Sequence, residues 1–464
     1  MRKNTPSRRT FLKQSMIISL GFSGLQSFLW KGCETTKEVI HKINLPYGPL
    51  LPDSKNRLKL PEGFSYKIIS RTGDVMTDGF FTPGLPDGMA TFEGEDGKVI
   101  VIRNHELLST DDGPFGKNNE MMSRVSPKKI YDLGSERVRC KGGTTTFIYN
   151  EDTGEIESSW LSLTGTIRNC AGGKMPWGSW VSCEETFAGK SKNLRKEHGY
   201  NFEVPVTTTP VLTEPIALRA MGRFNHEAVC ADPKTGIVYQ TEDRNDGAIY
   251  RFLPKEKGNL QAGGQLQILS IKYQKSLDTR NWEHQNMPLN QPLDVQWIDL
   301  ENVTPKKDIL RYQGFDKGAA RFARGEGMWF GEGEVYFACT SGGAKKWGQI
   351  FRYTPSPFEG SSRENEKPPT LELFLEPNDR EILQYCDNLT VAPWGDVVFC
   401  EDRGSPNIVG ITPQGEMYKI AKNIGTPSEF TGGVFSPSGK TFFVNIQHAG
   451  LTLAITGPWQ RRSG

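Results

Sequence analysis

The chain has 464 residues, of which 36% are hydrophobic and 10% aromatic, so it can fill a sizeable core and is not a disordered polypeptide. Its formal net charge is +2, but the first 33 residues carry six basic and no acidic residues, which leaves 50 basic and 54 acidic residues in the rest. A remainder with a formal charge of −4 excludes a basic nucleic-acid-binding surface, so no nucleic-acid partner is expected.

Residues 1–33 are typical of an export signal. The stretch SRRTFLKQSMIISLGFSGLQSFLW has paired arginines followed by a short apolar run that is rich in Ser and Gly. It resembles a twin-arginine signal, which predicts the twin-arginine export machinery as a partner and a periplasmic or extracellular location. Lys13 interrupts the apolar run, so no stable membrane span is expected. An ordinary secretory signal or an anchoring helix is the alternative, and Cys33 is a weak lipoprotein site because bulky Trp30 and charged Lys31 precede it.

Residues 34–60 are expected to form a linker, and residues 61–464 a single catalytic domain with an insertion around 255–320. The whole chain contains 50 glycines and 29 prolines, which favour short strands joined by turns. A strand–turn–strand unit recurs in this domain, in residues 88–106, 178–187, 225–254, 326–355, 387–415 and 431–456. Units that recur every ~40–50 residues predict an all-β fold, a single β-propeller of about six blades. A β-sandwich with a helical subdomain is the structural alternative.

Polar and charged residues gather where these units begin. In a propeller the innermost strands surround a channel, so residues at the starts of sequence-distant strands converge at its mouth. Carboxylates crowded in this way repel one another unless they hold cations. The unit starts that carry such residues are Asn104–Glu106, Glu184–Glu185, Asn225–Glu227, Arg324–Gly327, Asp387–Asn388 and Glu429.

The same segments carry a family resemblance. The motifs RNHE, GGTTTF, NCAGGKMPWGSWVSCEET, RFNHEAVCADPKTGIVYQTEDR, RGEGMWF, DNLTVAPWGDVVFCED and EFTGGVFSPSGKTFFVNIQHAG resemble those of the PhoX-type alkaline phosphatases. The resemblance runs from about residue 60 to residue 457. It implies a six-bladed propeller whose site holds two ferric ions and one to three calcium ions, with one iron bound by a cysteine. It also implies hydrolysis of small phosphate monoesters and, in some members, of other phosphate esters.

Carried over residue by residue, the resemblance makes Cys170 of NCAGG the iron thiolate and Arg324 of RGEG the residue that faces the phosphate. Asn104 or His105 is expected to donate a hydrogen bond or a proton to the leaving alcohol. The resemblance further implies that Glu185, Glu227 and Glu326 are metal ligands, and that Glu106, Asp387, Glu242 and Asp243 bind calcium or support the ligands.

The residue types fit this chemistry without the resemblance. Carboxylate oxygens suit Ca²⁺ and Fe³⁺, whereas a thiolate ligand excludes a site that holds only calcium. Clustered cations offset the charge of a phosphate and lower the pKa of a bound water until it is nucleophilic. The planar fork of Arg324 can bind two phosphate oxygens at once.

Two other classes of function remain open from the sequence. A calcium-dependent propeller lactonase or phosphotriesterase would not need Cys170, and a non-catalytic binding protein would need neither Cys170 nor Arg324. Cys170 could also be an ordinary buried thiol. Seven cysteines follow residue 33, and their odd number and irregular spacing argue against a complete disulfide framework. A monomer is expected.

Overall fold

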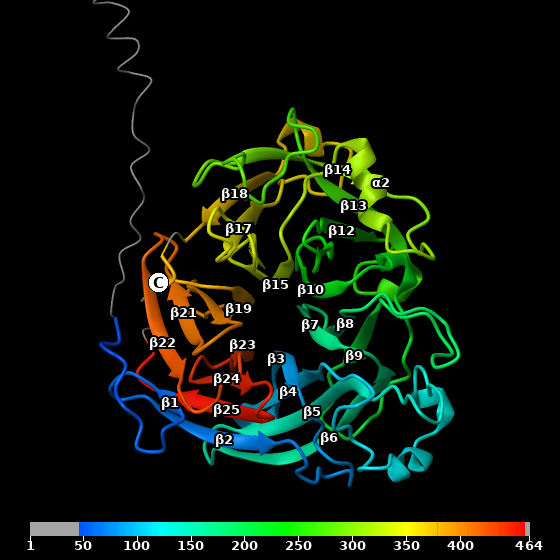
Figure 1. Ribbon diagram of the computed structural model, residues 1–464, viewed down its shortest axis with the longest axis vertical. Helices are drawn as coiled ribbons and strands as arrows, with labels where there is room; N and C mark the ends of the chain where they lie inside the picture. The colour runs from blue at the N-terminus through cyan, green and yellow to red at the C-terminus, as the bar shows by residue number, and fades with distance from the viewer. Residues whose placement is uncertain (1–45, 378, 460–464) are drawn as a thin grey trace, which may run out of the picture. The chain divides into compact units, whose positions relative to one another are not determined.

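The computed structural model describes residues 46–377 and 379–459, so the predicted export signal and Cys33 lie outside the described residues. The strands that it describes form six antiparallel blades around a central axis (Figure 1). The prediction of a six-bladed propeller is therefore confirmed, and the β-sandwich is excluded.

The first three blades follow one another along the chain, each starting from the axis. The first contains β3 (Pro86–Glu93), β4 (Lys98–His105), β5 (Gly142–Asn150) and β6 (Glu155–Thr166). The second contains β7 (Asn169–Met175), β8 (Ser179–Glu184) and β9 (Asn201–Pro205). The third contains β10 (His226–Ala231), β11 (Val238–Glu242), β12 (Ile249–Pro254), β13 (Gly264–Ile271) and β14 (Leu293–Asp299).

The last three blades complete the ring. The fourth contains β15 (Gly325–Gly331), β16 (Glu334–Cys339), β17 (Gln349–Thr354) and β18 (Thr370–Leu375), and β18 also pairs with β14 of the third blade. The fifth contains β19 (Cys386–Val391), β20 (Val397–Glu401), β21 (Asn407–Ile411), β22 (Met417–Asn423) and β1 (Leu58–Lys59). The sixth contains β23 (Phe430–Phe435), β24 (Thr441–Ile446), β25 (Leu451–Thr456) and β2 (Ser65–Arg71).

Both ends of the domain contribute to the outer strands. β2 pairs with β25 from Ser65↔Thr456 to Arg71↔Leu451, so an early strand completes the sixth blade and closes the ring. β1 pairs with β22, which places a strand inside the stretch expected to be a linker.

The expected insertion around residues 255–320 contributes two strands to the blades. It supplies β13 and β14, followed by α2 (Leu310–Lys317), the one α-helix among the described residues. The described chain also forms short 3-10 helices, namely η1 (Glu95–Gly97), η2 (Glu120–Arg124), η3 (Pro127–Lys129), η4 (Arg219–Met221), η5 (Leu260–Ala262) and η6 (Glu364–Glu366). None of the described helices is long and apolar enough to cross a membrane.

The hydrophobic core lies between neighbouring blades. Between the first and sixth blades, for example, Phe147 and Tyr149 of β5 pack with Phe443 of β24, and the rings of Tyr149 and Phe443 are 5.0 Å apart between centroids. Burial of such aromatic side chains is the main favourable contribution to folding. Each blade thus depends on its two neighbours, which fixes the inner strands relative to one another.

The six inner strands contact one another around the axis, in the order β3, β7, β10, β15, β19 and β23. Each has an irregularity in its pairing with the second strand near its start, for instance between His226 and Val229 and between Gly325 and Met328. Bulges of this kind bend a strand and redirect one side chain. In every inner strand except β23, the residue that follows the first one lies within the irregular segment.

Glycine allows the inner strands to approach one another closely. A Cβ atom on Gly327 would lie 2.5 Å from the backbone nitrogen of Leu389, and one on Gly88 would lie 2.7 Å from the Cα of Ala171. Any larger side chain at these two positions would push neighbouring blades apart. The segment Arg324–Gly327 is therefore charged and small because it borders both the channel and the next blade.

Candidate metal centre and substrate site

The inner ring of the site comes from equivalent positions in the blades. All the second residues of the inner strands that lie in an irregular segment, five in number, can bind a metal ion. The sixth second residue, Thr431, is regularly paired with Asn445. In blade order the six second residues are Asp87, Cys170, Glu227, Glu326, Asp387 and Thr431.

A second ring surrounds the first. Because adjacent strands run in opposite directions, the residue just after the second strand of a blade lies at the same edge as the start of the inner strand. Glu106 and Glu185 occupy such positions, so they follow the second strands instead of opening the inner strands as the sequence suggested. The six residues of this second ring are Glu106, Glu185, Asp243, Thr340, Asp402 and Gln447.

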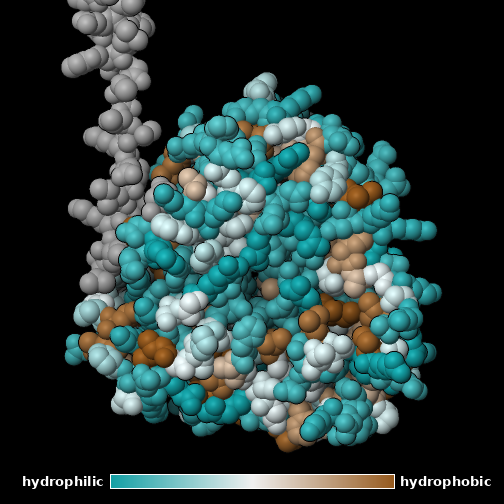
Figure 2. Space-filling view, in the orientation of Figure 1, coloured by the Kyte–Doolittle hydropathy of each residue, from teal (hydrophilic) through white to brown (hydrophobic). Residues whose placement is uncertain are grey.

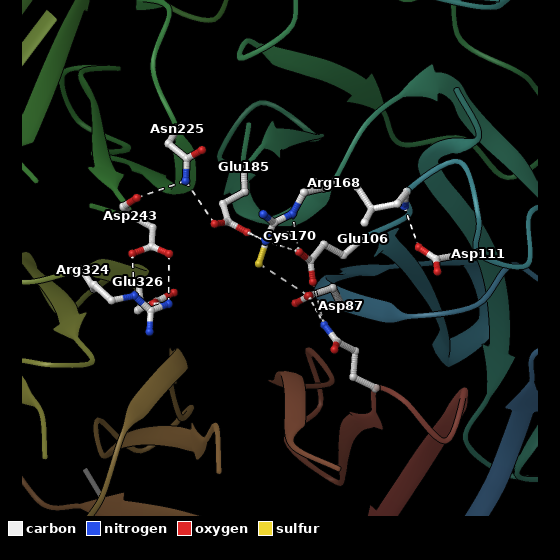
Figure 3. Close-up of polar contacts among 12 residues, drawn as sticks. Asp87, Glu106, Asp111, Arg168, Cys170, Glu185, Asn225, Asp243, Arg324 and Glu326 are labelled. Carbon is white, nitrogen blue, oxygen red and sulfur yellow. Dashed lines mark hydrogen bonds and ion pairs between the residues drawn. The ribbon is translucent and has the colours of Figure 1, made fainter. Parts of the chain in front are cut away.

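The two rings bring possible ligand atoms together in three overlapping groups. Within each group the atoms all lie within 4.8 Å of one another. The overlapping groups connect Asp87 of the first blade to Asp387 of the fifth. Figure 3 shows Cys170 between Glu185 and Asp87. The groups are Asp87–Glu106–Cys170, Cys170–Glu185–Glu227 and Glu227–Glu326–Asp387.

Glu227 has the least satisfied carboxylate in the site. Its side chain is fully buried, and neither oxygen has a hydrogen-bond partner among the described residues. Burial raises its pKa well above the usual range, and Glu326 and Glu185 raise it further. A buried charge without partners is strongly unfavourable. This carboxylate therefore requires a cation, either a proton or a metal ion.

The neighbouring acids have the same electrostatic problem. Burial, followed by repulsion from nearby carboxylates, raises the pKa of Asp87, Glu185, Glu326 and Asp387. Burial and then Asp87 also raise the pKa of the Cys170 thiol, whose Sγ lies 3.5 Å from Asp87 Oδ2. Several acids that oppose one another's ionisation form a set that binds multivalent cations well, because one such ion relieves several repulsions.

Arg324 lies at the edge of these groups. Its Nε and Nη2 donate to the two oxygens of Asp243 at 2.8 and 3.0 Å, and Nη2 also donates to Glu326 Oε1 at 2.8 Å. The charge of Glu326, with a further contribution from Asp243, raises the pKa of Arg324 and keeps it ionised. Asp243 thus orients the arginine beside the ligands and is not a member of any of the three groups.

Asn104 lies below the site in a structural position. It is fully buried, and its Nδ2 donates to the backbone carbonyls of Cys170 and Ala171 at 3.1 and 2.6 Å. Its Oδ1 accepts from Trp180 and Ser182. The amide has no free donor for a leaving group, and it instead fixes the backbone that presents Cys170.

His105 also differs from its predicted role. Its Nδ1 lies 2.8 Å from the carbonyl oxygen of Gly84 and its Nε2 lies 2.9 Å from Thr145 Oγ1, so both ring nitrogens are occupied. Burial and then nearby Arg103 lower its pKa well below the usual range. A buried, neutral imidazole with both nitrogens bonded is not placed to supply a proton to substrate.

Glu242 likewise lies apart from the ligand groups. Its Oε1 accepts from Arg311 at 3.2 Å, and its Oε2 accepts from Tyr250 at 2.9 Å and from the backbone nitrogen of Ala248. Burial raises its pKa to about 7, against the opposing effect of Arg311. The prediction that Glu242 binds calcium is not supported, because these three donors already satisfy its oxygens.

The sequence prediction missed Asp87, Arg168 and Gln447. Gln447 donates to Asp87 Oδ2 at 2.8 Å and to Glu106 Oε2 at 3.1 Å, which joins the sixth blade to the first across the ring closure. A signal for Asp87 exists in the sequence, because Asp87-Gly88-Met89 repeats the pattern of Glu326-Gly327-Met328.

One face of the molecule is hollowed at its centre. Figure 2 shows a depression at the centre of this face, bordered mainly by hydrophilic residues. A polar entrance of this kind suits a small, charged substrate.

Comparisons with known proteins identify one family. A family profile described as alkaline phosphatase PhoX matches residues 45–450. Among solved structures, the chain is similar to a gluconolactonase from Xanthomonas campestris, with a TM-score of 0.40 and 13% identity over 90% of this chain and 100% of that one. It is also similar to a putative 6-phosphogluconolactonase from Bacteroides uniformis, with a TM-score of 0.35 and 10% identity over 79% of this chain and 90% of that one. At such values these structures do not bear on the reaction. No curated protein matches the chain significantly.

Proposed function

Because the chain belongs to the alkaline phosphatase PhoX family, and is therefore a phosphoric ester hydrolase, we propose that it hydrolyses phosphate monoesters at the acidic mouth of its channel. The family is metal-dependent, and we propose iron and calcium as the ions of this protein. Phosphate diesters are secondary substrates in this proposal.

The observation that supports the proposal best is Glu227. A glutamate with two buried and unpartnered oxygens, surrounded by further acids, has no structural use in a metal-free protein, because it destabilises the fold. The same side chain is well placed for a bridging ligand, since it belongs to two of the three groups of possible ligand atoms. The residues present therefore fit the ions that the family requires.

The donor types suggest how the ions would be distributed. The group Cys170–Glu185–Glu227 offers one sulfur and two carboxylates, a set that suits iron and does not suit calcium. The group Glu227–Glu326–Asp387 offers oxygen atoms alone and suits calcium or ferric iron. When bound, the ions would neutralise the substrate phosphate and supply the nucleophile.

The chain's own residues would bind and orient the ester. Arg324 presents a guanidinium held by Asp243 and Glu326, and its Nη1 has no hydrogen-bond partner among the described residues. This free edge can donate to phosphate oxygens, and it contributes most when negative charge spreads over them in the transition state. Because Asp243 fixes the fork in advance, little reorganisation is needed during the reaction.

A chelation experiment tests the proposal. The protein is purified after export, its iron and calcium content is measured, and p-nitrophenyl phosphate turnover is followed before chelation, after chelation and after each ion is restored. We expect activity to be lost with the ions and to return when they are added. Full activity in protein shown to be free of metal would refute the proposal, and so would lactone hydrolysis by a calcium-only protein without phosphatase activity.

We also propose that the protein acts outside the cytoplasm after export through the twin-arginine route. The proposal rests on Arg8 and Arg9 and the short apolar run that follows them. Replacing both arginines with lysine should retain the protein and its phosphatase activity in the cytoplasmic fraction. Unchanged export of that variant would contradict the proposal.

A further inference from the structure

Arg168 occupies the same place in the second blade that Arg324 occupies in the fourth. Each residue directly precedes an inner strand and stands two residues before a proposed ligand, Cys170 or Glu326. Both have a backbone in the left-handed region, with φ of 50° for Arg168 and 53° for Arg324. The equivalent residues Leu85 and Tyr385 share this conformation, so it belongs to the position and supports the structural equivalence of the two arginines.

The two guanidinium groups use the same nitrogens, since each binds one carboxylate through Nε and Nη2 and a second carboxylate through Nη2. Arg168 uses Nε and Nη2 to bind Glu106 Oε1 at 2.9 and 2.7 Å, and Nη2 also binds Glu185. Its Nη1, like that of Arg324, has no hydrogen-bond partner in the described part of the chain. The side chains are 38% and 28% exposed, respectively, so the free edges are accessible from the mouth.

A chain of polar contacts connects the two arginines across the third blade. Arg168 binds Glu185, whose Oε1 accepts from Asn225 Nδ2 at 3.0 Å. The same Nδ2 lies 3.1 Å from the backbone oxygen of Asp243, which in turn binds Arg324 through its side chain (Figure 3). Asn225 itself directly precedes the inner strand β10. Three consecutive blades therefore present Arg168, Asn225 and Arg324 at one level, with Asn225 as a spacer.

The two arginines share no carboxylate partner, so they are two separate anion-binding points on either side of the Cys170–Glu185–Glu227 group. From this geometry we propose that Arg168 binds a second anionic group of the substrate while Arg324 binds the phosphate that is transferred. The substrate class would be phosphate esters that carry another phosphate or a carboxylate. An acidic mouth would otherwise repel such a group, and Arg168 supplies the local positive charge that offsets this repulsion. This inference rests on the proposed phosphatase function.

The test compares two substrates that differ in their second anionic group. Steady-state kinetics are measured for p-nitrophenyl phosphate, which has one phosphate, and for fructose 1,6-bisphosphate, which has two. The wild type, Arg168→Ala and Arg168→Lys are compared, together with iron and calcium content and the melting temperature. Arg352→Ala is the matched control, because Arg352 also pairs with two glutamates but lies on β17, away from the ligand groups.

We expect Arg168→Ala to reduce kcat/KM for the bisphosphate by about tenfold or more, mainly through KM, and for p-nitrophenyl phosphate by less than about threefold. Arg168→Lys should recover part of the loss, and Arg352→Ala should not discriminate between the substrates. Equal losses on both substrates, or loss of bound metal from Arg168→Ala, would overturn the proposal and make Arg168 an internal counterion of Glu106 and Glu185. If the wild type hydrolyses neither ester, the proposed phosphatase function itself fails.

Discussion

Replacing Glu227 with glutamine tests whether its unpartnered carboxylate holds metal. An ion present at a hundred times its dissociation constant stabilises the native state by about 2.7 kcal/mol. Unfolding of roughly 410 described residues carries an entropy of about 0.9 kcal/mol per kelvin, so chelation should lower the melting temperature by about 3 °C for each independent ion. In Glu227→Gln we expect most of this difference to disappear, because the residue belongs to two of the ligand groups.

The metal-free forms provide the opposite comparison. The glutamine has nearly the same shape but no charge, so metal-free Glu227→Gln should be at least as stable as the metal-free wild type. Calorimetry with and without chelator, together with elemental analysis, measures both effects. Glu359→Gln is the control, since Glu359 is a buried glutamate paired with Arg251 outside the site, and its loss should lower both melting temperatures equally. A Glu227→Gln protein that keeps the full stabilisation by metal would refute the reasoning.

Other variants and conditions test the remaining parts of the site. Arg324→Ala should keep its metal but lose about 2–5 kcal/mol of transition-state stabilisation, measured through kcat/KM, and Arg324→Lys should recover little of this loss. Wild-type kinetics in a metal-replete Arg324→Ala protein would remove the arginine from the mechanism. Cys170→Ala should lose iron and any thiolate-to-iron absorption band. The control Cys230→Ala removes a buried thiol from β10 and should retain both. Identical behaviour of the two variants would make Cys170 an ordinary thiol. Burial, followed by Asp402, raises the pKa of Glu429 from 4.5 to about 10. The folded metal-free protein therefore binds protons more tightly than the unfolded chain, so its melting temperature should fall as the pH rises from about 5 to 10. A melting temperature that rises over this range would contradict the prediction. His105→Asn should lower stability without moving the pH profile of kcat, and a displaced profile would restore a catalytic role for the histidine.

The repeat itself was predictable because propeller blades have a regular period. Inner strands of the last four blades begin at or beside the residues that the sequence indicates, and Glu326-Gly327 predicts both a ligand and a close approach between blades. β2 was not predictable in the same way, because it pairs with a strand almost 400 residues away and no local pattern marks that partner. The short pairing of β1 has the same origin.

Some of the site residues were predictable from sequence motifs, and others were not. Cys170, Glu227 and Glu326 carry distinctive motifs, and the structure brings them together. Asn104 and His105 belong to an equally distinctive motif, but hydrogen bonds occupy their side chains, those of Asn104 with the second blade and those of His105 with Gly84 and Thr145. The strength of a motif does not separate a ligand from a residue that supports one. Arg168 was missed because an arginine before a strand is common. Its role is suggested only when the second blade is aligned with the fourth, where Arg324 has the equivalent position.

The closure of the ring by β2 and β25 has a consequence for the order of events during synthesis. The contact between Gln447 and Asp87 joins the two sides of the seam, so the polar lining of the mouth is complete only when almost the entire domain has been translated. Pairings between such distant segments form slowly, because a long loop must be closed first. A nascent chain that ends before β25 would therefore have an incomplete ring, in which the acidic residues of the mouth are not yet held in one cavity. The acidic mouth is therefore assembled late, and its completeness depends on the intact seam.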